Sequence, residues 1–141
     1  MATGAEGFKE QRIALVERIL AARVAGDFDY LQSMSAPDIV VTLMGDRSII
    51  PNCGVFHGVA EAREALERVF IEFSFHDMKI THIMVDGEQV GLRWKGILRN
   101  RGTGASGQFE GFAHLIFQGG KIREYFSLVD TAAMSRLSHS D

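Results

Sequence analysis

The sequence predicts an α+β fold, in which helices that come early in the chain cover one face of an antiparallel sheet. Apolar residues recur at helical spacing before residue 74, and after Ser74 strand patterns separated by glycine-containing turns replace that period. Helices and strands that occupy different parts of a chain are typical of α+β domains rather than of parallel sheets with crossover helices.

The first two helices have recognisable ends. Leu15 and Ile19 lie at helical spacing within an amphipathic stretch that also carries charged residues. Gly26 can adopt the left-handed conformation that ends such a helix, because it lacks a Cβ atom. Asp27 is a good N-cap residue, so we expect a short second helix from Phe28 to about Ser33.

A strand, an irregular loop and a third helix should follow. The β-branched run at 39–42 predicts the strand, and the stretch 45–58, with its Gly, Pro and Asn residues, predicts the loop. Val55 and Phe56 lie within that loop, and we expect these apolar side chains to be buried and to anchor it. The helical period then returns over 59–73, which predicts the third helix.

Four strands are predicted in the second half of the chain. Turn signals separate them at Asp86-Gly87, at the glycine-rich segment 102–107 and at Gly119-Gly120. Strands joined in this way form a consecutive antiparallel meander. The predicted strands are 78–85, 89–98, 109–117 and 121–129.

A last short helix should begin near Thr131. Asp130 is placed as its N-cap, and Met134 and Leu137 form its apolar side. The residues after it, 138–141, are expected to fray.

Composition and charge limit the possible functions. The chain has 141 residues, 46% of them hydrophobic and 23% charged, which fits one globular domain over 1–141. A net charge of −3 argues against nucleic-acid binding, which needs a basic surface. There is no run of about 18 apolar residues that would predict a membrane span. Cys53 is the only cysteine, so no internal disulfide can form, and a reducing cytoplasm is the expected location.

We expect neither a metal site nor a cofactor. The histidines show no His-x-His or Glu-x-x-His spacing, and Cys53 has no partner in a metal-binding pattern. The glycine-rich segment 102–107 joins two predicted strands, so it lacks the helix N-terminus that completes a phosphate-binding loop.

The predicted strand 109–117 is apolar on both faces. One face carries Phe109, Gly111, Ala113, Leu115 and Phe117, and the other carries Phe112, His114 and Ile116. A strand with only one buried face alternates more cleanly between apolar and polar residues. We therefore expect the helices to cover one face and a second copy of the chain to cover the other, which gives a homodimer through the sheet with His114 in the interface.

Short motifs occur along the chain in a characteristic order. They are Ala25-Gly26-Asp27, Phe56-His57-Gly58, Asp86-Gly87, and Gly119-Gly120-Lys121-Ile122 leading into Glu124-Tyr125-Phe126 and Asp130. Together they resemble the SnoaL-like branch of the nuclear-transport-factor-type (ketosteroid-isomerase-like) superfamily over nearly the whole chain. The resemblance implies a cone-shaped, cystatin-like α+β barrel, in which a strongly curved antiparallel sheet wraps around the N-terminal helices and a deep apolar pocket. Isomerases, cyclases, hydrolases and non-catalytic binding domains share this fold, so the fold does not define the activity.

The resemblance also argues against one activity of the superfamily. Ketosteroid isomerases use a carboxylate base and an oxyanion hole made by a tyrosine and a protonated aspartate. The resemblance places Leu43, Ile19 and Ala113 at those three positions. None of these side chains can transfer a proton, so we do not expect ketosteroid isomerisation.

Arg93 and Glu124 are the leading candidates for chemistry. In the resemblance to limonene-epoxide hydrolases, which use an Asp-Arg-Asp set, Arg93 matches the arginine and Glu124 one acid, whereas Lys95 replaces the other acid. A guanidinium that faces a carboxylate in an apolar pocket could orient a substrate oxygen or a water. The resemblance places residues 93 and 95 on the cavity side. The strand period supports the alternative, with Leu92 and Trp94 inward and Arg93 and Lys95 in water.

We expect the protein to bind a small, largely apolar, oxygen-bearing molecule of polyketide-like, terpenoid or aromatic type. The predicted ligand-binding residues are Leu43, Phe56, Lys95, Ala113, Leu115 and Phe126. If the protein is an enzyme, the resemblance implies cofactor-free cyclase, isomerase or hydrolase chemistry. Polyketide cyclases use one aspartate in the pocket as the base. Asp130 matches an aspartate that is common in SnoaL-like chains, but its predicted role as an N-cap already accounts for it. The alternative is a non-catalytic ligand-binding or assembly domain of the same fold.

Overall fold

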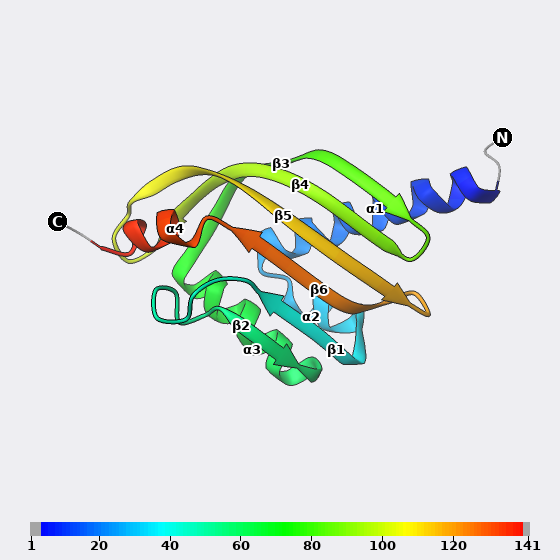
Figure 1. Ribbon diagram of the computed structural model, residues 1–141, viewed down its shortest axis with the longest axis horizontal. Coiled ribbons are helices and arrows are strands. Elements are labelled where there is room, and N and C mark those ends of the chain that lie inside the picture. The colour runs from blue at the N-terminus through cyan, green and yellow to red at the C-terminus, as the bar shows by residue number, and fades with distance from the viewer. Residues whose placement is uncertain (1–3, 140–141) are drawn as a thin grey trace.

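The computed structural model describes residues 4–139, which form four helices and six strands. In chain order these are α1 (Gly4–Ala25), α2 (Phe28–Ser33), β1 (Ser35–Leu43), β2 (Gly54–His57), α3 (Gly58–Glu72), β3 (Phe73–Asp86), β4 (Gln89–Asn100), β5 (Ser106–Gln118), β6 (Lys121–Val129) and α4 (Thr131–Leu137). Figure 1 shows the helices gathered against one long curved sheet, so the predicted α+β class is confirmed. Within residues 4–139, no helix is both long enough and apolar enough to span a membrane.

The six strands form a single sheet in the order β2-β1-β6-β5-β4-β3. The strands β3 to β6 make the predicted antiparallel meander. β1 departs from that pattern, because it runs parallel to β6, with Val41 opposite Tyr125, and antiparallel to β2. The sheet is therefore mixed rather than purely antiparallel. Parallel neighbours need a long connection, and here most of the chain lies between β1 and β6.

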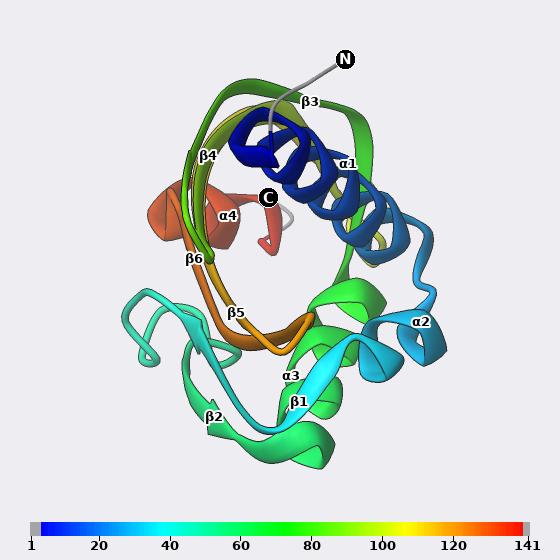
Figure 2. The same ribbon diagram turned by 90° about the vertical axis from the view of Figure 1, so that its right-hand side faces the viewer.

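The sheet bends around the helices without closing on itself. In Figure 2 the strands β4 to β6 form an arc on one side, β3 continues this arc over the top and down to α3, and α1, α2 and α3 lie on the other side. The concave face carries the core, where Leu92 and Leu115 are at most 1% exposed and pack in one cluster with Val16 and Ile19 of α1. This arrangement confirms the cone-shaped fold that the resemblance implied.

Gly26 ends α1 as predicted and fixes the helix against α3. Its φ is +75°, and a Cβ atom there would lie 2.6 Å from a ring atom of Phe70, so both the backbone and the packing require glycine. Asp27 caps α2, because its Oδ1 accepts a hydrogen bond from the Tyr30 backbone N–H at 3.1 Å. The Phe70 ring also meets Phe28 edge to face, with centroids 5.6 Å apart. The two helices therefore enter the fold at a defined angle.

The segment predicted as an irregular loop contains the edge strand β2. Val55 pairs with Thr42 of β1 on the outer side of the sheet. Val55 was expected to be buried, but it is 56% exposed because it lies on the outer face of an edge strand; Phe56, the next residue, is half-buried. A strand of four residues is too short for its alternation to be recognised beside Gly54.

The last helix, α4, begins at Thr131 with Asp130 as its N-cap, as predicted. The Asp130 carboxylate accepts a hydrogen bond from the Ala133 backbone N–H at 3.0 Å. Ser138 was expected in a frayed tail, but its hydroxyl accepts a hydrogen bond from the side chain of Asn100 and donates one to Glu72. Residues 140 and 141 of the predicted tail lie outside the described residues.

Replacing Asp130 by alanine should lower the free energy of unfolding by about 0.5–2 kcal/mol, because the Ala133 N–H loses its acceptor. Asp130→Asn keeps an N-cap oxygen and should retain most of the stability. Urea denaturation of the three proteins measures both effects. Equal stability of Asp130→Ala and the unchanged protein would show that the cap contributes nothing.

Candidate functional site

The concave face of the sheet and α1 enclose a cavity of about 700 Å³. The elements around it form the ring seen in Figure 2. Its lining is mostly apolar and includes Leu20, Val24, Leu43, Phe75, Ile80, Trp94 and Val129. The size and the lining are those of a small-molecule site.

Strand alternation decides which side chains reach this cavity. Tyr125, Ser127 and Val129 of β6 all line it, and the residues between them face the outer side of the sheet. Trp94 of β4 also lines it, and its indole lies over Gly111 of β5, where any Cβ atom would overlap the ring. The sheet therefore contributes two hydroxyl groups and a large aromatic surface.

The far end of the cavity is closed by the 44–53 connection and α4. Ile50, Cys53 and Met134 line it there and are buried together in a second, smaller core cluster. Asn52 also lines this end and donates a hydrogen bond from Nδ2 to Glu72 Oε2 at 3.2 Å. Burial raises the pKa of the Cys53 thiol, so the sulfur stays protonated at neutral pH and is a poor nucleophile.

Four residues that line the cavity are exposed. Glu17 and Ala21 of α1 and Lys79 of β3 mark a mouth between these two elements, and Met44 lies directly after β1. Nearer the start of α1, Arg12 Nη2 forms an ion pair with Glu88 Oε1 of the β3–β4 turn at 3.1 Å. Charged groups at the mouth lie in water, where their mutual attraction is weak.

Arg23 brings a positive charge to the wall of the cavity. Its side chain is half-buried, and its Cζ lies 5.5 Å from the ring centroid of Phe75 and 5.8 Å from that of Tyr125. Its Nε is buried and has no hydrogen-bond partner among the described residues. A second cavity, of about 30 Å³, lies on the α2 side of the same arginine.

Of the ligand-binding residues predicted from the sequence, Leu43 lines the cavity. Ala113 and Leu115 are at most 1% exposed and pack within the main core, and neither lines the cavity. Phe56 packs against the core from β2, and Phe126 is half-buried on the outer face of β6. Their part in ligand binding stays a prediction.

Arg93, Lys95 and Glu124 are exposed on the outer face of the sheet and do not line the cavity. Arg93 lies opposite Phe112 of β5, whereas Glu124 lies opposite Ile116, so four residues of β5 separate their rows. At about 3.3 Å per residue, the offset along the strand is about 13 Å. The structure thus corrects the cavity-side placement that the resemblance implied, and it does not bring Arg93 and Glu124 together. A catalytic role for them stays a prediction.

The cavity offers few groups for acid–base chemistry. Its titratable lining side chains, among residues 4–139, are Glu17, Arg23, Cys53, Lys79 and Tyr125. Glu17 and Lys79 lie exposed at the mouth. In the same part of the chain, no cluster of three or more His, Cys, Asp or Glu side chains could hold a metal ion. The arrangement is suited to binding an apolar molecule and directing its polar group toward Arg23, Tyr125 and Ser127.

The sequence analysis missed Arg23, although the sequence contains a signal for it. Val16, Ile19 and Arg23 are spaced i, i+3 and i+7, so they share one face of α1, and the first two are at most 1% exposed. A charged residue on the buried side of an amphipathic helix needs a reason, and here it borders a cavity.

The chain is similar to known proteins of this fold. The model of the SnoaL-like domain matches residues 16–125. An NTF2-like protein of unknown function from Burkholderia pseudomallei has 20% identity and a TM-score of 0.78, covering 91% of this chain and 97% of that chain. A candidate SnoaL-like polyketide cyclase from Jannaschia sp. CCS1 has 14% identity and a TM-score of 0.77, covering 94% of each chain. An LEH-like epoxide hydrolase from M. tuberculosis has 22% identity and a TM-score of 0.66, covering 86% of this chain and 84% of that chain.

No curated protein sequence matches the chain. At such low identities the solved structures show a shared fold rather than a shared activity. The family model, in contrast, spans most of the sequence, from α1 to Tyr125 of β6. The chain therefore belongs to the SnoaL-like family, and it shares its fold with the NTF2-like protein from Burkholderia pseudomallei.

Proposed function

We propose that this protein binds a small, largely apolar, oxygen-bearing molecule in the cavity between α1 and the sheet. The observation that carries the proposal is the cavity of about 700 Å³ with a mostly apolar lining and a few polar groups. Pockets of this kind bury most of a small ligand, while a small number of polar contacts fix its orientation. Tyr125 and Ser127 supply hydroxyl groups, and Arg23 supplies a charge.

A neutral fluorescent probe, N-phenyl-1-naphthylamine, tests this proposal. Ser127 and Leu128 are successive residues of β6 on opposite faces, since Ser127 lines the cavity and Leu128 is 45% exposed on the outer face. Ser127→Phe fills part of the cavity and should weaken probe binding at least about tenfold, or by about 1.4 kcal/mol. Leu128→Phe should leave the affinity unchanged.

Fluorescence titration measures the affinities, and native mass spectrometry of the protein as purified shows whether a small molecule is retained. Equal weakening by the two variants, or no probe binding by the unchanged protein, would contradict the proposal. Arg93→Ala serves as a further variant, because Arg93 does not line the cavity; a loss of probe affinity in this variant would support the predicted role of Arg93 in the site.

Catalysis of the cyclase or hydrolase kind is the second candidate function. The names of the Jannaschia and M. tuberculosis proteins favour it, together with Glu17, which is the one carboxylate that lines the cavity among the described residues. Glu17 lies at the mouth, so it would act as a base only on a substrate atom held there. Turnover of a polyketide-like or epoxide substrate that Glu17→Gln abolishes without loss of binding would favour the enzyme over the binding protein.

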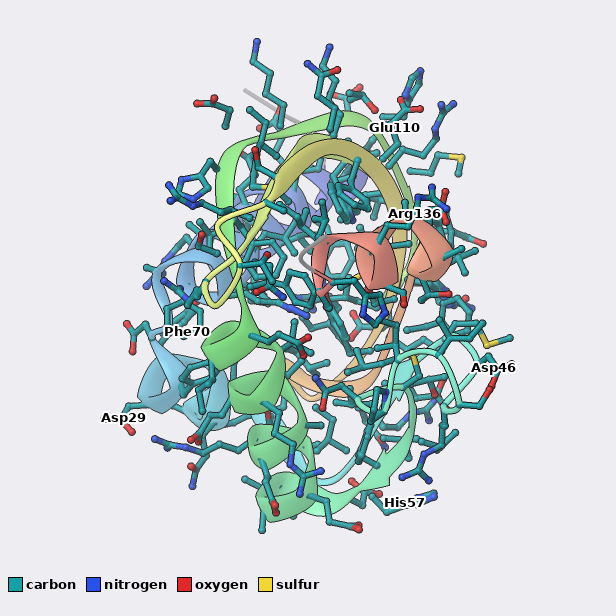
Figure 3. The ribbon with its side chains drawn as sticks, turned by 90° about the vertical axis from the view of Figure 1, so that its left-hand side faces the viewer. Asp29, Asp46, His57, Phe70, Glu110 and Arg136 are labelled. Carbon is teal, nitrogen blue, oxygen red and sulfur yellow. The ribbon has the colours of Figure 1, made fainter. Side chains whose placement is uncertain are left out.

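We also propose that the outer face of the sheet packs against a second copy of the chain. Phe112, Ile116 and Phe126 are half-buried on this face, and Leu128 is 45% exposed beside them. The charged residues around this apolar centre are Arg93, Lys95, Glu110 and Glu124, and Figure 3 shows Glu110 on the outside of the curved strands. Equal numbers of basic and acidic groups let the face meet a copy of itself without net repulsion.

Phe112→Glu should convert the proposed dimer into a monomer, because it places a charge at the centre of the apolar patch. Ile71→Glu is the matched control, since Ile71 is also apolar and 71% exposed but lies on α3, away from this face. Sedimentation or native mass spectrometry gives the subunit count. A monomeric unchanged protein would contradict the proposed dimer and leave the proposal for the cavity intact.

A further inference from the structure

Arg23 stands where the core of α1 would ordinarily have an apolar residue. It shares the buried face of the helix with Val16 and Ile19 and borders the main cavity. Taking a charge out of water is costly unless other groups replace the lost hydration. The position therefore needs an interaction partner for the guanidinium.

The described residues provide only some of the interactions that the guanidinium of Arg23 needs. The rings of Phe75 and Tyr125 lie within 6 Å of the Arg23 Cζ, at 5.5 and 5.8 Å, which is the range of a cation–π contact. Nε is buried without a hydrogen-bond partner, and the ion pairs found within residues 4–139 do not include Arg23. A guanidinium has five N–H donors, and no aromatic face can satisfy them.

Arg12 of the same helix has both aromatic contacts and a carboxylate partner, although its Nε, like that of Arg23, is buried without a hydrogen-bond partner among the described residues. Its guanidinium lies over Phe8 and Phe117 at 4.7 and 4.8 Å, and it also forms the ion pair with Glu88. Arg23 has the equivalent aromatic contacts but lacks the carboxylate, and the space next to it is cavity. The cavity beside Arg23 therefore has room for an anionic group of a bound ligand.

The other residues that line the cavity would not repel a bound anion. Glu17 is the one lining carboxylate in the described part of the chain, and it lies exposed at the mouth, where Lys79 offsets it. Glu17 and Arg23 are six residues apart, or about 9 Å along the helix axis. At the far end, Asn52 and the protonated Cys53 are neutral.

We propose that the ligand of this cavity is an apolar carboxylic acid, whose carboxylate binds the Arg23 guanidinium while its hydrocarbon part lies against Phe75, Trp94 and Ile80. This inference rests on the proposed binding function and names the chemical class of the ligand. A planar carboxylate accepts two parallel hydrogen bonds from a guanidinium, which fixes its orientation as well as its affinity. Arg23 is thus the specificity-determining residue of the cavity.

Two probes of nearly the same shape test this assignment: 2-naphthoate, which is charged, and 2-naphthamide, which is neutral. The unchanged protein should bind naphthoate about 10- to 100-fold more tightly than naphthamide, because the hydrogen bonds to Arg23 are charge-assisted. Arg23→Gln should remove that preference. Arg18→Gln is the matched control and should retain it, because Arg18 is an exposed arginine of the same helix, lies over Tyr30 at 5.2 Å and does not line the cavity.

Isothermal titration calorimetry at neutral pH measures all six affinities, and circular dichroism checks the folding of each variant. Equal binding of the two probes by the unchanged protein, or a preference that survives in Arg23→Gln, would overturn the assignment. If Arg23→Gln does not fold, the comparison of the two probes on the unchanged protein decides alone. If the protein binds N-phenyl-1-naphthylamine but does not prefer naphthoate to naphthamide, or binds neither of these two probes, only this inference is contradicted. Failure of the neutral amine to bind contradicts the proposed function itself.

Discussion

Gly111→Ala is expected to lower the free energy of unfolding by about 1–3 kcal/mol and to alter the cavity wall. A Cβ atom at position 111 would overlap the indole of Trp94, which lines the cavity. The ring would have to move away from β5, toward the cavity. Trp94 is the only tryptophan of the chain, so its fluorescence reports this movement directly.

Gly91→Ala is the matched control for that substitution. Gly91 lies on the neighbouring strand β4, and a Cβ atom there would meet Phe112 at 3.7 Å and Met84 at 3.8 Å, which is ordinary contact. Urea denaturation, the Trp94 emission spectrum and the affinity for N-phenyl-1-naphthylamine should change in Gly111→Ala and stay constant in Gly91→Ala. If the two variants behaved alike, the position of the Trp94 ring would not depend on the lack of a side chain at residue 111.

Asn100→Ala is expected to destabilise the protein by about 2–4 kcal/mol, because it leaves several polar groups without partners. Asn100 is 4% exposed, and its Oδ1 accepts hydrogen bonds from the backbone N–H groups of Gly102 and Thr103, each at 2.9 Å. Its Nδ2 donates to Ser138 Oγ at 3.2 Å, and Ser138 Oγ donates to Glu72 Oε1 at 3.0 Å. One amide therefore connects the β4–β5 turn, the end of α4 and the end of α3.

The same chain of hydrogen bonds reaches the cavity, since the other oxygen of Glu72 accepts from Asn52. Asn100→Ala should therefore also weaken binding of the neutral amine, because α4 and the 44–53 connection close the far end of the cavity. Gln108→Ala changes an exposed residue of the same hairpin and should cost less than about 0.5 kcal/mol. Denaturation curves and probe titrations of both variants test the pair of effects. A variant Asn100→Ala as stable as Gln108→Ala would show that the network contributes little.

The turns of the meander could be predicted because their signals are local. Gly87, Gly119 and Gly120 have φ values of +57°, +59° and +77°, which only glycine adopts readily. The start of β3 had no such signal. β3 begins at Phe73, directly after α3, and not at Met78 as predicted, because the chain passes from helix to strand without a turn residue.

The pairing of β1 could not be predicted from its own residues. A β-branched run indicates a strand but not its neighbour, and β1 lies beside β6, which is far away in the sequence. For the same reason the edge position of β2 and the exposure of Val55 were missed. These features depend on how the whole sheet is assembled.

For the site, the alternation of β4 was a better guide than the resemblance. The strand period placed Trp94 inward and Arg93 and Lys95 in water, as the structure has them. Leu43 was predicted as a lining residue and is one. Arg23 could not be recognised from strand alternation, because it lies on the buried face of the first helix.

The part of the cavity wall that α1 forms is held differently from the part that the sheet forms. A strand of the sheet is joined to its neighbours by backbone hydrogen bonds, whereas α1 packs against the sheet through side chains such as Val16 and Ile19. Substitutions at Ala21 or Val24 should therefore change the shape of the cavity while the hydrogen bonds of the sheet stay intact.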